Sequence, residues 1–530
     1  MDHHNRFGLE SLGIFLFALL LFTLGIWDQQ PQGFDGRWAL FLQEMFRHGA
    51  SLFPTTYGQP YADYPGTATF LSYLFARLLG APNHLANVLP TALASAAVVA
   101  LIYRLLVPSS RQWALLTVLL TLLTTQLLEK SRAVCLDQMV ALLCVASFYL
   151  LHRGGHQWRL AVFPLFILGF AIRGPLGLIE VCGVVCVYWA LGRPGERVKQ
   201  VLIHGIVGLV LLAACWWLLV KLARISGGGA FADEVFKMQV GGRLDETGEP
   251  FYFYFQLSLY RYFPVVPLAL AAMIALRKRW SERFAGDMQM VVRLGACGLM
   301  ILLGLSIPHF KRAYYILPMV PMFAAVAAYG LLQAQGWLAG VRQCYEALVV
   351  ALPTLCVVVV FVCRHGWQKH GYWPDVSLPL LIGVLVMLQV AALLAWRRAG
   401  RLVWLSLCAL IAQWLLLVAV VEPAKDLQFD TRQFVGQVEA LRAAQPGPLV
   451  FVDLGRDTWA VRYMMNLDHD EQPVFVGSDQ IGRLSALPRP AWVIVAHKEA
   501  ALLRGTPLLS QVPDFQGRLN DNPLMVFLLK

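Results

Sequence analysis

An acidic and a basic side chain stand two residues apart in Phe34-Asp35-Gly36-Arg37-Trp38, just after the first long apolar segment. A carboxylate held where a chain leaves a bilayer is costly unless it binds or catalyses something. Asp35 is therefore a candidate functional residue, such as a catalytic base. The alternative is that Asp35 caps the helix predicted by the following ALFLQEMFRHG. Both roles can hold at once.

The loop that follows carries more polar and aromatic side chains. Aromatic rings and charges in one loop offer stacking surfaces and hydrogen bonds to a sugar, although tyrosines near a membrane also form interfacial belts. The residues predicted to contact substrate in this loop are Arg37, Tyr61, Asp63 and Tyr64.

A second carboxylate, Asp137, opens a later apolar segment, a few residues after Glu129-Lys130-Ser131-Arg132. A carboxylate at the mouth of a membrane helix must pair with a cation or bind a ligand. Asp137 is therefore a candidate second catalytic group. The alternative is a salt bridge to Arg132 or Lys130.

Four basic residues lie in loops that the charge pattern places on the same side as Asp35. Arginine holds a phosphate through two parallel hydrogen bonds and lysine adds a point charge, so these residues are candidate phosphate ligands. The alternative is that they reach toward lipid headgroups. The four are Arg173 in a Gly-Pro turn, Arg243 in a glycine-rich loop that resembles a mobile lid, and Lys311 and Arg312. Tyr315, which follows the last pair, is a further candidate substrate contact.

The composition requires a membrane to position these groups. The chain of 530 residues is 58% hydrophobic and only 14% charged, whereas soluble domains carry about 25% charged residues. Apolar runs of about 20 residues indicate a polytopic α-helical protein. The net charge of +11 gathers in short loops between the runs, which is typical of membrane topology and not of nucleic-acid binding. About thirteen spans are predicted, at 11–27, 87–107, 112–128, 137–151, 160–172, 175–191, 201–221, 256–276, 290–307, 314–333, 346–363, 377–396 and 402–421.

The charge bias also predicts orientation and domains. Basic loops near residues 193–199, 277–283 and 397–401 mark the cytoplasmic side, so the candidate site faces the other side. We expect a membrane domain over 1–424, with outer loops at 28–86 and 222–255. Residues 425–530 alternate apolar strands with helices and predict a small outer α/β domain. All ten cysteines lie in or beside apolar segments, so no disulfide framework or zinc site is expected.

A family resemblance follows from the order of these motifs. Asp35-x-Arg37, Asp137, Arg173-Gly174-Pro175 and Lys311-x-x-x-Tyr315-x-Leu317-Pro318-x-x-Pro321 resemble, in order and spacing, the GT-C integral-membrane glycosyltransferases. The resemblance covers residues 11–330. It is closest to the bacterial branch that contains aminoarabinose transferase and the protein O-mannosyltransferase-like enzymes.

The resemblance implies an activity and its partners. It implies a bacterial inner-membrane enzyme that takes a sugar from a polyprenyl phosphate, such as undecaprenyl phosphate, with inversion. The acceptor would be lipid A, another envelope glycan or a protein outside the cytoplasm. Membrane lipids are implied as partners and nucleic acid is not. A divalent cation between carboxylates and phosphate is compatible with the sequence but not required by it.

The sequence also departs from the family pattern. Gly36 stands where the family usually has glutamate, Asp63-Tyr64-Pro65-Gly66 replaces a Lys-Pro-Pro, and Arg173 replaces a lysine. These changes leave the acceptor open. The alternative function is a transporter or flippase of lipid-linked sugars, which would need polar groups along a path through the membrane. Glu180 is the one obvious buried candidate for such a group.

Overall fold

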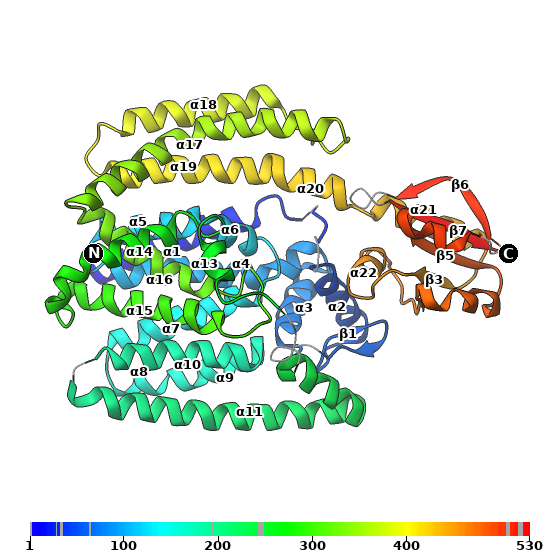
Figure 1. Cartoon of the computed structure of the whole chain (residues 1–530), viewed down its shortest axis with the longest axis horizontal. Helices are drawn as coiled ribbons and strands as arrows, with labels where there is room; N and C mark the ends of the chain where they lie inside the picture. The colour runs from blue at the N-terminus through cyan, green and yellow to red at the C-terminus, as the bar shows by residue number, and fades with distance from the viewer. Residues whose placement is uncertain are drawn as a thin grey trace.

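Long helices lying side by side form most of the protein, and a small sheet lies at one end (Figure 1). The computed structural model describes residues 3–27, 29–31, 35–62, 65–192, 194–241, 248–504, 509–517 and 523–530. Each of the thirteen predicted apolar segments coincides with a helix. These helices are α1 (His3–Thr23), α4 (His84–Leu106), α5 (Arg111–Leu123), α7 (Leu136–Arg153), α9 (Val162–Arg173), α10 (Pro175–Ala190), α11 (Pro194–Phe236), α14 (Val265–Leu276), α15 (Gly286–Ser306), α16 (Val320–Leu332), α17 (Trp337–Gln368), α18 (Leu378–Ala395) and α19 (Arg401–Leu416).

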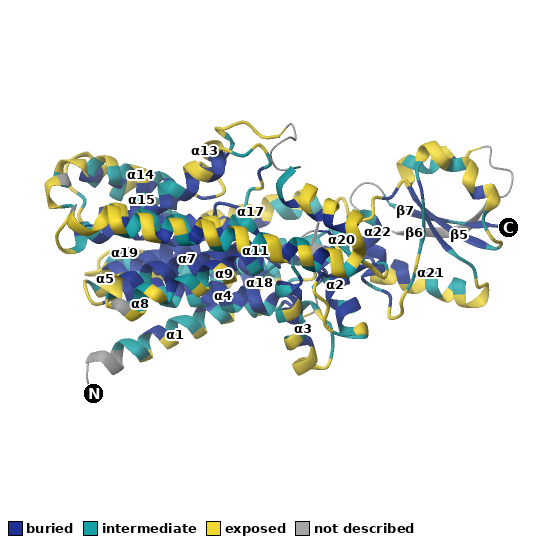
Figure 2. Cartoon of the chain, turned by 90° about the horizontal axis from the view of Figure 1, so that it is seen from below, coloured by how far each residue is buried: buried dark blue, intermediate teal, exposed yellow. Residues whose placement is uncertain are grey.

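The buried residues gather in the middle of this bundle (Figure 2). Polar side chains cap the first turns of two of its helices. The side chain of Asn83 accepts a hydrogen bond from the Ala86 amide at the start of α4, and Ser110 caps α5 in the same way. The Trp113 indole donates to the Ala325 carbonyl at 2.8 Å and joins α5 to α16. On the outside, apolar side chains such as Leu209, Val362 and Leu380 are more than 60% exposed, as expected for surfaces that face lipid.

The number of membrane crossings is not confirmed. Among the described residues, six helices are long and apolar enough to cross a membrane, or seven if α5 and α6 (Thr125–Ser131), bent by 74°, form one span. Helices such as α10 and α16 are apolar but shorter than the roughly 20 residues that a bilayer core requires. The protein is thus helical with membrane character, and thirteen crossings stay a prediction.

Shorter helices and a two-stranded hairpin lie between the bundle and the sheet (Figure 1). The loop after α1 forms α2 (Asp35–His48), the hairpin β1 (Thr55–Thr56) and β2 (Gln59–Pro60), and α3 (Thr67–Leu79). The remaining short helices are α8 (His156–Leu160) and α13 (Phe253–Ser258). The helix predicted after Asp35 is therefore present, and α3 adds an apolar helix that was not among the predicted spans.

A five-stranded mixed sheet forms the C-terminal part, in the order β4-β3-β5-β7-β6. Strand β3 pairs in parallel with β4 and β5, whereas β7 pairs antiparallel with β5 and β6. The apolar runs PLVFVDL, PVFV, AWVIVA and LMVFLL, which predict four strands, contain β3, β4, β5 and β7. Apolar clusters cover both faces of the sheet. The elements are α20 (Glu422–Phe429), α21 (Arg432–Ala444), β3 (Leu449–Val452), α22 (Trp459–Met464), β4 (Val474–Val476), β5 (Ala491–Ala496), β6 (Leu509–Gly517) and β7 (Leu524–Leu529).

The connection between the two parts is helical. Helix α19 continues through residues 417–421 into α20, so the predicted boundary at 424/425 falls inside a helix. The independence of the two parts and the outer location of the sheet stay predictions.

Candidate functional site

Helix α2 begins at Asp35, the first candidate catalytic residue. The Asp35 side chain and three other predicted site residues, Asp63, Tyr64 and Arg243, lie outside the described residues. Their roles therefore stay predictions, and the site is built below from its described neighbours.

Arg37 and Tyr61, both predicted to contact substrate, are brought together. Arg37 Nη1 donates a hydrogen bond to the Tyr61 hydroxyl at 3.1 Å, and its guanidinium lies 5.6 Å from the Tyr61 ring centroid. The Tyr61 hydroxyl donates in turn to Asp457 Oδ2 at 2.9 Å. Burial, followed by the Asp457 charge, raises the pKa of Tyr61 above its usual value of 10. Asp457 belongs to the C-terminal part, and no local motif marks it as a site residue.

Asp137 forms a buried ion pair with Arg173. Arg173 Nε donates to Asp137 Oδ1 at 3.0 Å, and both side chains are at most 3% exposed. The Arg173 guanidinium lies 4.5 Å from the ring centroid of Tyr315, so three predicted site residues form one cluster. The turn after Arg173 requires glycine, because Gly174 has φ +66° and an added Cβ would lie 2.8 Å from Gln239 Oε1.

Arg132 pairs with Glu422 and not with Asp137. Its Nε and Nη2 donate to the two oxygens of Glu422, each at 2.7 Å. Its Nη1 and Nη2 also donate to the Leu21 and Leu24 carbonyls at the end of α1. The alternative that Asp137 forms a salt bridge to Arg132 is thus wrong. Arg173 reaches Asp137 because the turn between α9 and α10 lies beside the start of α7.

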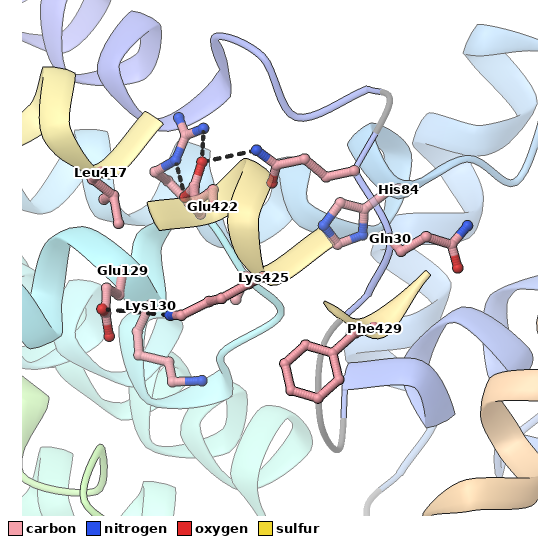
Figure 3. A pocket seen from close by; sticks show the side chains of 11 residues that line it. Gln30, His84, Glu129, Lys130, Leu417, Glu422, Lys425 and Phe429 are labelled. Atoms are coloured by element: carbon pink, nitrogen blue, oxygen red, sulfur yellow. Dashed lines mark hydrogen bonds and ion pairs between the residues drawn. The ribbon is translucent and has the colours of Figure 1, made fainter. Parts of the chain in front are cut away.

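A cavity of about 300 Å³ opens beside Arg132. Figure 3 shows Lys425 of α20 reaching toward Glu129, with Lys130 close by and His84 on the opposite wall. The Lys425 amine lies 3.8 Å from Glu129. Lys130, Arg132 and Lys425 line the cavity against two carboxylates, Glu129 and Glu422, so the lining carries one excess positive charge and suits an anion. His84 and Lys425 are site residues that sequence reasoning missed, because neither stands in a motif.

Two further cavities share residues with this one. An apolar cavity of about 320 Å³, lined by side chains such as Phe263, Leu352 and Val359, shares Glu129 and Leu417 with it. A smaller one of about 230 Å³, lined by Trp367, His370, Tyr372, Ala424 and Gln428, shares Lys425. An apolar, a cationic and an aromatic cavity are therefore neighbours in that order.

Lys130 connects the cationic cavity with the Asp137 cluster. Its amine lies 5.3 Å from the ring centroid of Tyr314, which packs against Tyr315 at 5.4 Å. Lys311 and Arg312 are not among the residues that line this cavity. Lys311 Nζ donates to the Glu249 carbonyl at 2.8 Å, and burial lowers the pKa of Lys311. The Arg312 guanidinium lies 5.0 Å from the Phe310 ring.

Among the described residues, no group of three or more acidic, histidine or cysteine side chains is placed to hold a metal ion. The side chains of Asp35 and Asp63 lie outside the described residues.

Comparison with known proteins gives a fold for the whole chain. Residues 63–219 match the family described as dolichyl-phosphate-mannose-protein mannosyltransferase. The crystal structure of ArnT from Cupriavidus metallidurans in the apo state matches with a TM-score of 0.74 at 14% identity, over 100% of this chain and 99% of that one. The chain has the GT-C fold.

The same fold recurs in further GT-C structures. ArnT bound to undecaprenyl phosphate matches with a TM-score of 0.73 at 16% identity, over 98% of this chain and 97% of that one. The apo oligosaccharyltransferase from Archaeoglobus fulgidus matches with a TM-score of 0.50 at 9% identity, over 92% of this chain and 70% of that one. Among curated proteins, none matches the chain in sequence. The predicted GT-C resemblance is confirmed as a fold.

Proposed function

We propose that the protein is a glycosyltransferase that takes a sugar from a polyprenyl phosphate, of the undecaprenyl type, and transfers it with inversion to an acceptor. The acceptor lies on the outer face of a bacterial inner membrane and is a lipid such as lipid A, another envelope glycan or a protein. The observation that carries the proposal is the whole-length match to ArnT, which has been crystallised with undecaprenyl phosphate.

The cavities support the choice of donor. A polyprenyl phosphosugar consists of an apolar chain, an anionic phosphate and a polar ring, in that order. The apolar cavity suits the chain, and the cationic cavity with Lys130, Arg132 and Lys425 suits the phosphate. Trp367 and Tyr372 offer aromatic surfaces to a sugar beyond Lys425.

The reaction needs little beyond charge and placement. The donor leaves as a lipid phosphate, so cations near the leaving oxygen stabilise the charge that develops there. Lys130 and Lys425, together with Arg243, Lys311, Arg312 and Arg173 from the sequence analysis, are the proposed sources of that charge. Asp35 takes the proton of a hydroxyl acceptor, or orients an acceptor that is itself a phosphate. Asp137 holds the Arg173 guanidinium against Tyr315.

The rival function is movement of a lipid-linked sugar across the membrane. One observation favours it: Glu180 is 3% exposed, and both of its carboxylate oxygens are buried without a hydrogen-bond partner among the described residues. Polar groups buried in membrane helices often mark transport paths. A single residue defines no path, so transfer remains the proposal.

A direct assay separates the two functions. Purified protein in nanodiscs is incubated with radiolabelled polyprenyl-phosphate sugars and an envelope acceptor fraction, with and without EDTA. Transfer of label to an acceptor supports the proposal, and its loss in EDTA would show that a cation takes part. Absence of transfer, together with movement of labelled lipid between the leaflets of proteoliposomes, would contradict the proposed transferase and support the flippase.

A further inference from the structure

The C-terminal sheet contacts the first loop of the membrane domain through the edge formed by the carboxyl ends of its parallel strands. Strands β3 and β4 are parallel, and the loop that follows β3 carries Asp453, whose φ of +52° is uncommon for a non-glycine residue. In α/β sheets, ligands usually bind outside the carboxyl ends of parallel strands. Here that edge holds the hairpin after α2: the Tyr57 hydroxyl donates to the Arg456 carbonyl at 2.7 Å, and its ring packs on Phe475.

The start of α2 packs directly against α22. Gly36 is buried, and a Cβ added there would lie 3.1 Å from Val461 Cγ1 and 3.4 Å from Met465 Sδ. The Gln43 amide on the same helix donates to the Met465 carbonyl. A larger side chain at position 36 would therefore push the C-terminal part away from the turn that begins with Asp35.

A chain of hydrogen bonds runs from this edge to Arg37. The Tyr61 hydroxyl has one proton, which it donates to Asp457, and this leaves its lone pairs facing Arg37 Nη1. The Arg37 guanidinium also lies 5.6 Å from the Tyr61 ring and 5.7 Å from the Trp38 ring. Asp457 thus fixes the direction of the hydroxyl, and the hydroxyl fixes one arm of the guanidinium.

We propose that Asp457 is a positioning residue: through Tyr61, the C-terminal part holds the Arg37 guanidinium in place in the first turn of α2. The proposal rests on the proposed function, since it takes the predicted substrate contact Arg37 as a contact to the substrate of that transferase. It gives the C-terminal part a role in transfer, as one wall of the site.

Activity assays test this role against a purely structural one. Asp457→Ala should lower kcat/KM about 10- to 100-fold, the scale of one lost hydrogen bond to a charged group. Asp457→Asn still accepts a hydrogen bond and should retain more activity. Combining Tyr61→Phe with Asp457→Ala should cost no more than the larger single effect, because both remove the same link. The melting temperature should change little in all three variants.

The matched control is Asp470→Ala, which removes a carboxylate from the same interface. Asp470 pairs with Arg47 and His48 of α2, about three turns from Arg37. Its kcat/KM should match that of the wild type. Equal losses in Asp470→Ala and Asp457→Ala, or full activity in Asp457→Ala, would overturn the positioning role.

Hydrogen exchange gives a readout that needs no activity. In the full-length protein, Asp457→Ala should raise amide exchange across residues 55–62, and Asp470→Ala should not. If the wild type transfers no sugar but this exchange rises, the proposed function fails while the link to Asp457 stands. If exchange across 55–62 does not change, the positioning role fails whatever the activity.

Discussion

The buried pair of Asp137 and Arg173 can serve stability, transfer or both, and paired substitutions separate the two. Removing one partner of a buried ion pair typically costs about 3–5 kcal/mol. Arg173→Ala should therefore lower the melting temperature strongly. Asp137→Asn combined with Arg173→Gln removes both charges and should recover much of that loss.

Turnover of the doubly substituted protein decides whether the Asp137–Arg173 pair also serves transfer. If the Arg173 guanidinium acts on the donor, the double variant stays inactive although it is folded. Wild-type turnover in that variant would restrict Asp137 and Arg173 to a structural role.

The lysines of the cationic cavity give a second prediction at the residue scale. A hydrogen bond to a charged group contributes about 1.5–3 kcal/mol, and 1.4 kcal/mol is tenfold in an equilibrium constant. Lys130→Ala and Lys425→Ala should each raise the donor concentration at half-maximal rate about 10- to 100-fold, measured at saturating acceptor. Lys221→Ala, on the outside of α11 beside Trp217, is the control and should change nothing. Unchanged donor dependence in both cavity variants would move the phosphate site toward Lys311 and Arg312.

At the scale of elements, Arg132 ties three segments together. It binds Glu422 of α20 through two hydrogen bonds and the last carbonyls of α1, from the turn after α6. Glu422→Ala leaves this arginine buried without its carboxylate, so we expect a loss of about 3–5 kcal/mol. Glu282→Ala breaks an exposed pair with Arg279 and should leave the melting temperature nearly unchanged. Equal melting temperatures for the two variants would contradict a structural role for the buried pair.

The interface between the first loop and the sheet should respond to alkaline pH. Burial raises the pKa values of Tyr57 and Tyr61 above the usual value of 10. When the loop packs on the sheet, both hydroxyls keep their protons at a pH above 10 at which the unpacked loop loses them. The packed state is therefore fully stable below pH 10 and becomes less stable as the pH rises above it. Between pH 10 and 11, the rate of hydrogen exchange across residues 55–62 should rise more steeply than the intrinsic exchange rate does. A Tyr57→Phe, Tyr61→Phe protein should lack this excess, and an equal excess in that protein would contradict the assignment.

At the scale of the whole molecule, charge predicts orientation. Basic residues near 277–283 and 397–401 mark one end of the bundle, and the sheet lies at the other (Figure 1). A reporter that is active only in the periplasm should therefore be active when fused after Lys530. The same reporter fused in the loop between α18 and α19 is the internal control and should be silent. The reverse pattern would place the candidate site in the cytoplasm and contradict the proposed donor and acceptor.

The sequence alone determined the helices of the bundle and four strands of the sheet. Apolar runs specify helices such as α4 and α15 without knowledge of any partner, because in a bilayer the backbone must satisfy its own hydrogen bonds. The short runs 449–452 and 491–496 predict buried strands in the same local way. Motif order was enough to indicate the GT-C fold, which the whole-chain comparison confirms.

Only the tertiary structure decided which charges meet. Asp137 had nearby cations in Arg132 and Lys130, yet it pairs with Arg173, and Arg132 pairs with a carboxylate 290 positions away. Asp457 reaches Tyr61 across 396 positions. Hydropathy specifies how each segment contacts its solvent, whereas an ion pair depends on the distance between two segments, which packing sets. The cationic cavity follows the same rule, because Lys130 and Lys425 lie together only once α20 has packed against the turn after α6.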